Sequence, residues 1–255
     1  MSVYVTGDIH GCPTRFGTNI FFEQKEFSGN KDENVVIICG DFGLVWNRVK
    51  ESKEEKYWLD WLQDKPFTTV FVDGNHDNFE RIDTYPVKEW HGGKVHEIRE
   101  NVLHLMRGEV FTIENKKFFA FGGASSHDIS DGIIDYKDPD LRIKEHELEM
   151  NGKFMYRIKG LTWWEEELPT IEEMQHGIKK LKENNNEVDF IVTHSPSTSE
   201  LETINTFYGA DILTDYLEEI KNTVKYDEHI FGHMHINRNI NEKDSCLYEQ
   251  IIRIV

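Results

Sequence analysis

Gly7-Asp8-Ile9-His10-Gly11 is the stretch on which the interpretation of this chain depends. It directly follows a predicted short buried strand, Val3 to Thr6, which begins with the apolar run Val3-Tyr4-Val5. Residues two positions apart point to the same side of an extended backbone, so Asp8 and His10 would face one ligand together. The flanking glycines allow a sharp turn and a close approach by a ligand. An acid and an imidazole at the end of a first strand predict part of a metal site.

Four later stretches repeat this design, in which an apolar run ends in polar residues that bind metal ions. The runs cover 35–39, 69–72, 188–192 and 228–231. Continuous apolar runs of this length are typical of strands buried on both faces. Helical patterns at 51–63, 170–183 and 210–222 lie between or beside them. Strands that alternate with helices predict parallel pairing in an α/β fold.

The remaining segments are less regular. A weak helical pattern covers 12–24, and a polar loop is expected over 28–34. Tyr57, Trp58, Trp61 and Leu62 have helical spacing, which predicts that they pack on the sheet. Thr170 and Glu173 form a capping-box pattern at a helix start.

Residues 102–106, 110–113 and 117–121 predict three short antiparallel strands, with a hairpin tip at Asn115-Lys116. Two closing strands are expected at about 236–241 and 246–254. The polar stretch 124–169 shows no clear period, and a loop of that length in a compact domain is usually functional or disordered. We therefore expect a single domain over 1–255, in which 124–169 forms a cap or rim.

Composition limits the functions that the chain can have. The formal net charge is -18, which argues against a grip on long nucleic acids but allows small phosphorylated substrates. Three widely spaced cysteines form neither a disulfide framework nor a zinc-binding pattern. No apolar segment approaches the roughly 20 residues that span a bilayer, and the N-terminus lacks a signal-peptide pattern. We expect a cytoplasmic protein without a membrane partner.

Residues that bind metals stand at the ends of five predicted strands. They are Asp8, His10, Asp41, Asn75, His76, His194, His233 and His235. Singly, such residues are usually structural: a Gly-Asp pair often makes a turn, and Asn-His-Asp could cap a helix. Together they would meet at one edge, because ligands bind beyond the carboxyl ends of strands in open α/β sheets.

The ligand types indicate which metals would bind. Carboxylate, amide and imidazole ligands without thiolates suit Mn²⁺, Fe or Zn²⁺ better than Ca²⁺ or Mg²⁺. The candidates are too many for one ion. They fit two metal ions that share one bridging carboxylate, an arrangement that recurs in phosphoryl chemistry.

At this point the sequence resembles the calcineurin-like metallophosphoesterases, in particular small bacterial and phage-type members. The resemblance rests on five motifs in the family's order: Asp8-Ile9-His10, Gly40-Asp41-Phe42-Gly43, Gly74-Asn75-His76-Asp77, His194 and Gly232-His233-Met234-His235. It implies a four-layer α-β-β-α sandwich of two mixed sheets flanked by helices. A dinuclear metal site would lie at the carboxyl edge of the strands.

The resemblance also implies a role for each residue. One metal ion would be held by Asp8, His10, Asp41 and His235, and the other by Asp41, Asn75, His194 and His233. His76 would stabilise the transition state or protonate the leaving group, and Asp77 would orient His76. A water shared by two cations loses a proton near neutral pH, which gives the hydroxide that attacks phosphorus.

The expected function is therefore hydrolysis of phosphomonoesters or phosphodiesters in small substrates, nucleotides among them. A protein serine/threonine phosphatase is disfavoured, because Gly43-Leu44-Val45-Trp46 replaces that group's Asp-Arg-Gly and Asp77 replaces its Glu. A nuclease is disfavoured by the net charge of -18. An alternative from a different class is a binding module that keeps the fold but has lost catalysis, although no metal ligand is missing.

Softer candidates concern the rim of the site. His127 and Asp128 could reach it, and Arg81 or Arg142 could contact a substrate phosphate. His91, His96 and His104 are expected to be structural. The sequence leaves the substrate, the native metal pair and the oligomeric state open.

Overall fold

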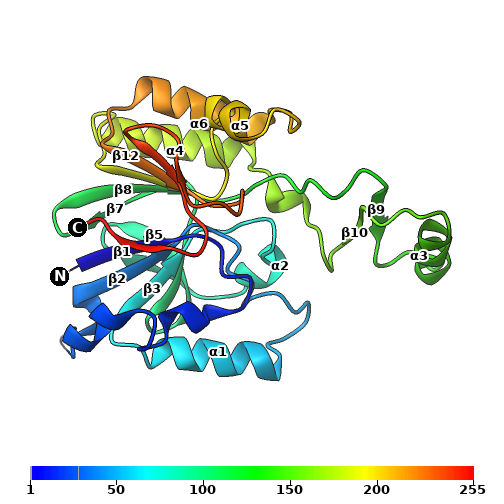
Figure 1. The fold of residues 1–255 in the computed structure, drawn as a ribbon, viewed down its shortest axis with the longest axis horizontal. Coiled ribbons are helices and arrows are strands. Elements are labelled where there is room, and N and C mark those ends of the chain that lie inside the picture. The colour runs from blue at the N-terminus through cyan, green and yellow to red at the C-terminus, as the bar shows by residue number, and fades with distance from the viewer. Residues whose placement is uncertain (1, 28) are drawn as a thin grey trace.

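Two facing β-sheets with helices on their outer faces make up most of the structure, a computed structural model that describes residues 2–27 and 29–255 (Figure 1). The predicted four-layer arrangement of two mixed sheets is confirmed. Residue 28, at which the polar loop was predicted to begin, lies outside the described residues.

The first sheet has a parallel centre and antiparallel edges. Its order is β15 (Ile251–Arg253), β1 (Ser2–Thr6), β2 (Asn34–Ile38), β3 (Thr68–Phe71), β6 (Val102–Leu105), β5 (Gly93–Arg99) and β4 (Val87–Trp90). Strands β1, β2, β3 and β6 pair in parallel, as predicted for the first three. The hairpin of β4 and β5 was not predicted, because its edge strand is half exposed and rich in polar residues.

The second sheet has the same plan. Its order is β13 (Arg238–Asn239), β14 (Asp244–Cys246), β12 (Glu228–Phe231), β11 (Phe190–Thr193), β8 (Lys116–Phe121) and β7 (Glu109–Ile113). The hairpin of β7 and β8 turns at Glu114 and Asn115, where φ is 52° and 59°. The predicted antiparallel trio is wrong in one respect, since β6 belongs to the first sheet and pairs there with β5 and β3.

Alternation along the strands divides the core into layers. In β2, Val35 and Ile37 pack between the two sheets, whereas Val36 and Ile38 face outward. Helix α1 (Lys53–Gln63) covers that outer face. Leu59 and Leu62 supply its buried contacts. The neighbouring aromatics contribute less than predicted: Trp58 and Trp61 are only partly buried, and Tyr57 is 60% exposed, so its place in the core was wrong.

Helices α4 (Ile171–Glu183) and α6 (Ile212–Thr223) cover the second sheet, as predicted. The capping box of Thr170 and Glu173 is present at the start of α4. Two short helices were not predicted, α2 (Phe79–Ile82) and α5 (Thr198–Ile204).

The weak helical pattern over 12–24 forms no α-helix. It contains two 3-10 helices, Pro13–Phe16 and Phe22–Glu26, separated by a break after Gly17. Further 3-10 turns cover Lys31–Glu33 and Glu165–Glu167.

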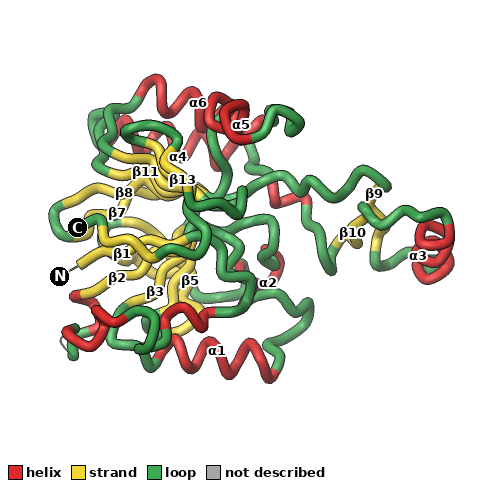
Figure 2. The backbone as a smooth tube through the Cα atoms, viewed as in Figure 1, coloured by secondary structure: helices red, strands yellow, loops and turns green. Residues whose placement is uncertain are grey.

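The stretch predicted as a cap or rim forms an arm that projects beyond the strand ends (Figures 1 and 2). We use "the arm" for residues 128–163. It contains β9 (Gly132–Asp135), α3 (Leu141–Met150) and β10 (Tyr156–Lys159), and β9 and β10 form a separate parallel pair. None of the α3 residues is buried. Within the described part of the chain, no helix has the length and apolar character needed to cross a membrane.

Candidate metal centre

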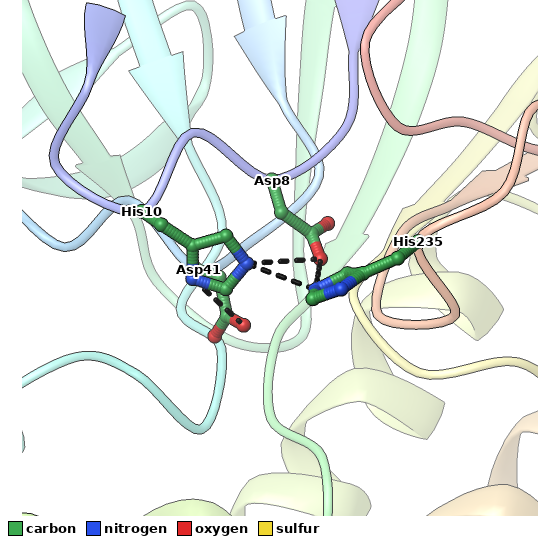
Figure 3. Close-up of side chains that lie close together, drawn as sticks. All are labelled: Asp8, His10, Asp41 and His235. Atoms are coloured by element: carbon green, nitrogen blue, oxygen red, sulfur yellow. Dashed lines mark hydrogen bonds and ion pairs between the residues drawn. The ribbon is translucent and has the colours of Figure 1, made fainter.

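Loops from both sheets meet beyond the carboxyl ends of the strands, and there they bring together Asp8, His10, Asp41 and His235 (Figure 3). The potential ligand atoms of these four side chains all lie within 4.8 Å of one another. Asp8 Oδ2 is 3.8 Å from His10 Nε2 and 3.2 Å from His235 Nε2. Asp41 Oδ2 is 3.7 Å from His10 Nδ1. The four predicted ligands of one metal therefore form a single cluster.

The potential ligand atoms of this cluster are arranged as a bound cation would require. Asp8 Oδ2 is buried and has no hydrogen-bond partner, although such atoms normally have one. The Nε2 atoms of His10 and His235 face each other at 2.9 Å. A cation among these atoms would satisfy the carboxylate oxygen and both imidazole nitrogens at once.

A second group of side chains adjoins the first through Asp41. Asp41 Oδ1 lies 3.3 Å from His194 Nε2, and Asn75 Oδ1 lies 3.3 Å from the same nitrogen. The rings of His194 and His233 have centroids 4.9 Å apart. The two oxygens of Asp41 thus face different groups, which is the position that a bridging carboxylate requires.

The backbone at four of the seven predicted ligands is in the left-handed region. The φ angles of His10, Asp41, His233 and His235 are 43°, 46°, 64° and 51°. Each such residue costs on the order of 1–3 kcal/mol and persists only where the surroundings enforce it, usually at functional sites. The sequence signals this geometry by placing glycines beside these residues, in Gly7 to Gly11 and Gly40 to Gly43.

Two of the motif glycines leave space for the carboxylates. A Cβ atom at Gly74 would lie 2.2 Å from Asp41 Oδ1, and one at Gly232 would lie 2.2 Å from Asp8 Oδ1. Any side chain at these positions would displace a candidate ligand. The glycines of the third and fifth motifs are therefore required by close packing against the acids.

The acids control the protonation of the buried histidine. Burial alone would lower the pKa of His194, but Asp41 and Asp8 outweigh it and raise the pKa to about 10. His194 Nδ1 lies 2.7 Å from the Cys39 carbonyl oxygen, to which it donates its proton. Burial instead lowers the pKa of His10 and of His233. These two rings are neutral near pH 7, the form in which imidazole binds a metal.

His76 lies beside the cluster and faces a residue of the arm. Its backbone N–H donates to Asp41 Oδ1 at 2.8 Å, and its Nε2 accepts from Arg157 Nη2 at 3.2 Å. Burial lowers the pKa of His76 despite the opposing charge of Asp41, and the charge of Arg157 lowers it further. The ring is therefore neutral in this state, whereas the resemblance implied a protonated His76.

Asp77 has a different place from the one predicted. Its carboxylate accepts hydrogen bonds from the backbone N–H groups of Phe42, Gly43 and Gly74 at 3.2, 2.9 and 2.9 Å. Burial and the nearby Asp41 raise its pKa well above the usual range. These contacts hold the second and third motif loops together, so Asp77 supports the loops instead of orienting the His76 ring.

Asn75 is oriented by two residues that sequence reasoning missed. Its Nδ2 donates to Ser126 Oγ at 3.4 Å, and Ser126 donates through its N–H and Oγ to Glu167 at 2.9 and 2.7 Å. With its amide nitrogen held in this way, Asn75 directs its oxygen at His194 Nε2. Burial raises the pKa of Glu167 to about 8, so this carboxyl is mostly protonated at neutral pH.

A cleft of about 560 Å³ opens over the cluster. Both softer rim candidates reach it: Asp128 lines it, and His127 Nε2 lies 2.9 Å from His233 Nε2. Arg157 of the arm also lines it, and sequence reasoning missed this residue. The two arginines named from the sequence lie elsewhere. Arg81 is buried against Glu55 at 2.8 Å, and Arg142 is on the exposed helix α3.

A second acidic and histidine cluster consists of Glu200, His229 and Asp244. Here a lysine supplies the positive charge, since Lys221 Nζ lies 2.6 Å from Glu200 Oε1 and 2.8 Å from Asp244 Oδ2. His229 Nδ1 lies 2.9 Å from the same Glu200 oxygen. Lys221 thus pairs with both carboxylates of this cluster, whereas among the described residues no lysine or arginine pairs with Asp8 Oδ2, which has no hydrogen bond.

Comparison with known proteins agrees with this geometry. The family model described as calcineurin-like phosphoesterase matches residues 1–237 of the 255-residue chain. No curated protein matches the sequence.

Proposed function

The chain belongs to the calcineurin-like phosphoesterases, and we propose that it is a metal-dependent hydrolase of phosphomonoester or phosphodiester bonds in small molecules, nucleotides among them. The observation that carries the proposal is the convergence of Asp8, His10, Asp41 and His235, with one Asp8 oxygen buried and without a hydrogen bond. A phosphoesterase of this family needs metal ions, and this cluster offers ligands of the right chemistry.

The donor set supports two ions with Asp41 between them. Its Oδ2 faces the cluster of Asp8, His10 and His235, and its Oδ1 faces His194 and Asn75. We assign His233 to the second group because of its ring contact with His194. Imidazole and carboxylate donors without thiolates favour Mn²⁺ and Fe, and Zn²⁺ would also fit. When bound, such ions polarise phosphoryl oxygens and lower the pKa of bound water.

The protein's own groups supply the rest of the chemistry. His76 lies at the cleft, held by Asp41 through its backbone, and we assign it to the leaving group. Its imidazole is neutral in the free protein, but a negatively charged phosphoryl group beside it would favour protonation. A protonated His76 could then donate to the departing oxygen, which is general acid catalysis.

The test is reconstitution of chelator-treated protein with Mn²⁺, Fe²⁺ or Zn²⁺, each added separately. An aryl phosphomonoester, an aryl phosphodiester and a panel of nucleotides serve as substrates. Turnover with at least one metal, and its loss on chelation, is expected. Stoichiometric metal binding without turnover of any substrate would instead favour a binding module.

A further inference from the structure

The arm places one cationic side chain, that of Arg157, in the lining of the cleft. Arg157 comes from β10, opposite Ile133 of β9 in the parallel pair. Although β9, β10 and α3 project away from the sheets (Figure 1), the Arg157 side chain is only 11% exposed. Among the described residues that line the cleft, Arg157 is the only lysine or arginine.

Its guanidinium group is fixed on two sides. Nε lies 2.8 and 2.9 Å from the two oxygens of Asp128, and Nη1 donates to the Thr162 carbonyl oxygen at 2.9 Å. These contacts engage Nε and Nη1 of the guanidinium group and leave Nη2 directed into the cleft. A guanidinium held this way loses little side-chain entropy when it binds a ligand.

The group that Nη2 meets is a poor partner for it. Nη2 lies 3.2 Å from the Nε2 atom of His76, whose ring also lines the cleft. Arginine has only donors, and its preferred acceptors are carboxylate and phosphate oxygens, which it binds through charge-assisted hydrogen bonds. An anion between Arg157 and His76 would give Nη2 a stronger acceptor.

We propose that Arg157 is a substrate-binding residue that contacts a non-bridging oxygen of the phosphoryl group in this cleft. The inference deepens the proposed function and rests on it. It makes the arm part of the active site, because Asp128, Arg157 and Thr162 all belong to the arm.

The other arginines considered from the sequence cannot take this role. Arg81 is buried with Glu55, and its Nη1 also donates to the Asn47 carbonyl oxygen at 2.8 Å. Arg142 is 91% exposed on α3 and pairs with Glu145. Arg142 is therefore a matched control, because it lies on the same arm but away from the cleft.

The experiment measures binding of inorganic phosphate to the Mn²⁺-loaded protein by isothermal titration calorimetry. Arg157→Met keeps much of the aliphatic stem and removes the charge, and we expect about tenfold or more weaker binding, as for loss of a hydrogen bond to a charged group. Arg142→Met should bind phosphate as the unaltered protein does. Arg157→Lys should fall between them, since lysine keeps the charge but not the fork.

Two results would overturn the inference: no phosphate binding by the unaltered protein, or equal phosphate affinity in Arg157→Met and Arg142→Met. Should Arg157→Met fail to fold, Arg157→Lys decides the matter by the same comparison with Arg142→Lys. Turnover of the ester panel is measured in parallel. Turnover with unchanged phosphate affinity in Arg157→Met removes the role of Arg157 and leaves the proposed function standing. Phosphate binding that depends on Arg157, without turnover of any ester, would support the role of Arg157 and contradict the proposed hydrolase function.

Discussion

Asp41 Oδ1 lies 3.3 Å from His194 Nε2, and both side chains are buried. The other oxygen of Asp41 faces His10 at 3.7 Å, so this one carboxylate connects the two groups of candidate ligands. The contact between Asp41 and His194 links the carboxyl ends of β2 and β11, which belong to different sheets.

Asp41→Asn should lower metal occupancy and abolish turnover. The substitution keeps the shape of the side chain but removes the charge that two cations would share. Metal content after gel filtration, measured by mass spectrometry, gives the direct readout, and Asp64→Asn at the exposed end of α1 is the control. Full activity in a metal-replete Asp41→Asn protein would refute the bridging role.

Metal binding should release protons at pH 7. Asp41 and Asp8 raise the pKa of His194 to about 10 against the effect of burial, so His194 carries an extra proton at pH 7 without metal. A coordinated imidazole must give up that proton, and metal affinity therefore falls as the pH is lowered. Titration calorimetry in two buffers of different ionisation enthalpy counts the protons. Identical heats in both buffers would contradict the prediction.

Gly74→Ala should disable the site without a change in any ligand. The new Cβ would lie 2.2 Å from Asp41 Oδ1, closer than real contacts allow, so the carboxylate must move. We expect loss of bound metal and of turnover. Gly29→Ala is the control, because its Cβ would meet nothing within 4 Å. Retention of metal by Gly74→Ala would show that the loop can shift while Asp41 still binds.

Glu167→Gln should remove part of the loss of stability at high pH. Burial raises the pKa of Glu167 to about 8 from its usual value of 4.5. Between these values the unfolded chain is ionised while the folded protein keeps its proton, so the free energy of unfolding falls as the pH rises and levels off above about 8. Chemical denaturation in the presence of chelator, from pH 4 to 9, would measure how the free energy of unfolding changes with pH.

The comparison with Glu166→Gln, an exposed neighbour, completes this test. Relative to that control, Glu167→Gln should gain stability progressively from pH 4.5 to 8. A constant difference between the two variants across the range would mean that Glu167 titrates with an ordinary pKa.

Lys221→Met should destabilise the fold and leave metal binding intact. Lys221 pairs with Glu200 and with Asp244, both of which are buried. Removal of one partner from a buried charge cluster costs about 3–5 kcal/mol. Urea denaturation would measure the loss, with Lys179→Met on the exposed face of α4 as the control. A fall in metal content of the folded variant would contradict the separation of the two clusters.

The apolar strands and their polar ends could be predicted because burial on both faces leaves a continuous apolar run. The predicted strand over 228–231 matches β12 residue for residue. The strand ends then located Asp8, Asp41 and His235, since parallel strands deliver their carboxyl ends to one edge.

What could not be predicted depends on partners distant in sequence. Arg157 lies in a polar stretch without periodicity, and only the folded arm brings it to His76. Glu167 is one of three consecutive glutamates, yet it alone of the three is buried, because Ser126 binds it. The sequence offers no local signal that separates these residues from their neighbours.

The separation of the cluster's members along the chain has a consequence for protein synthesis. His10 and His235 meet at 2.9 Å although 225 positions separate them. Asp8, His10 and Asp41 leave the ribosome well before His235, the fourth member of the cluster. Completion of the candidate centre therefore requires synthesis through His235, and a product truncated before this residue would lack its fourth side chain.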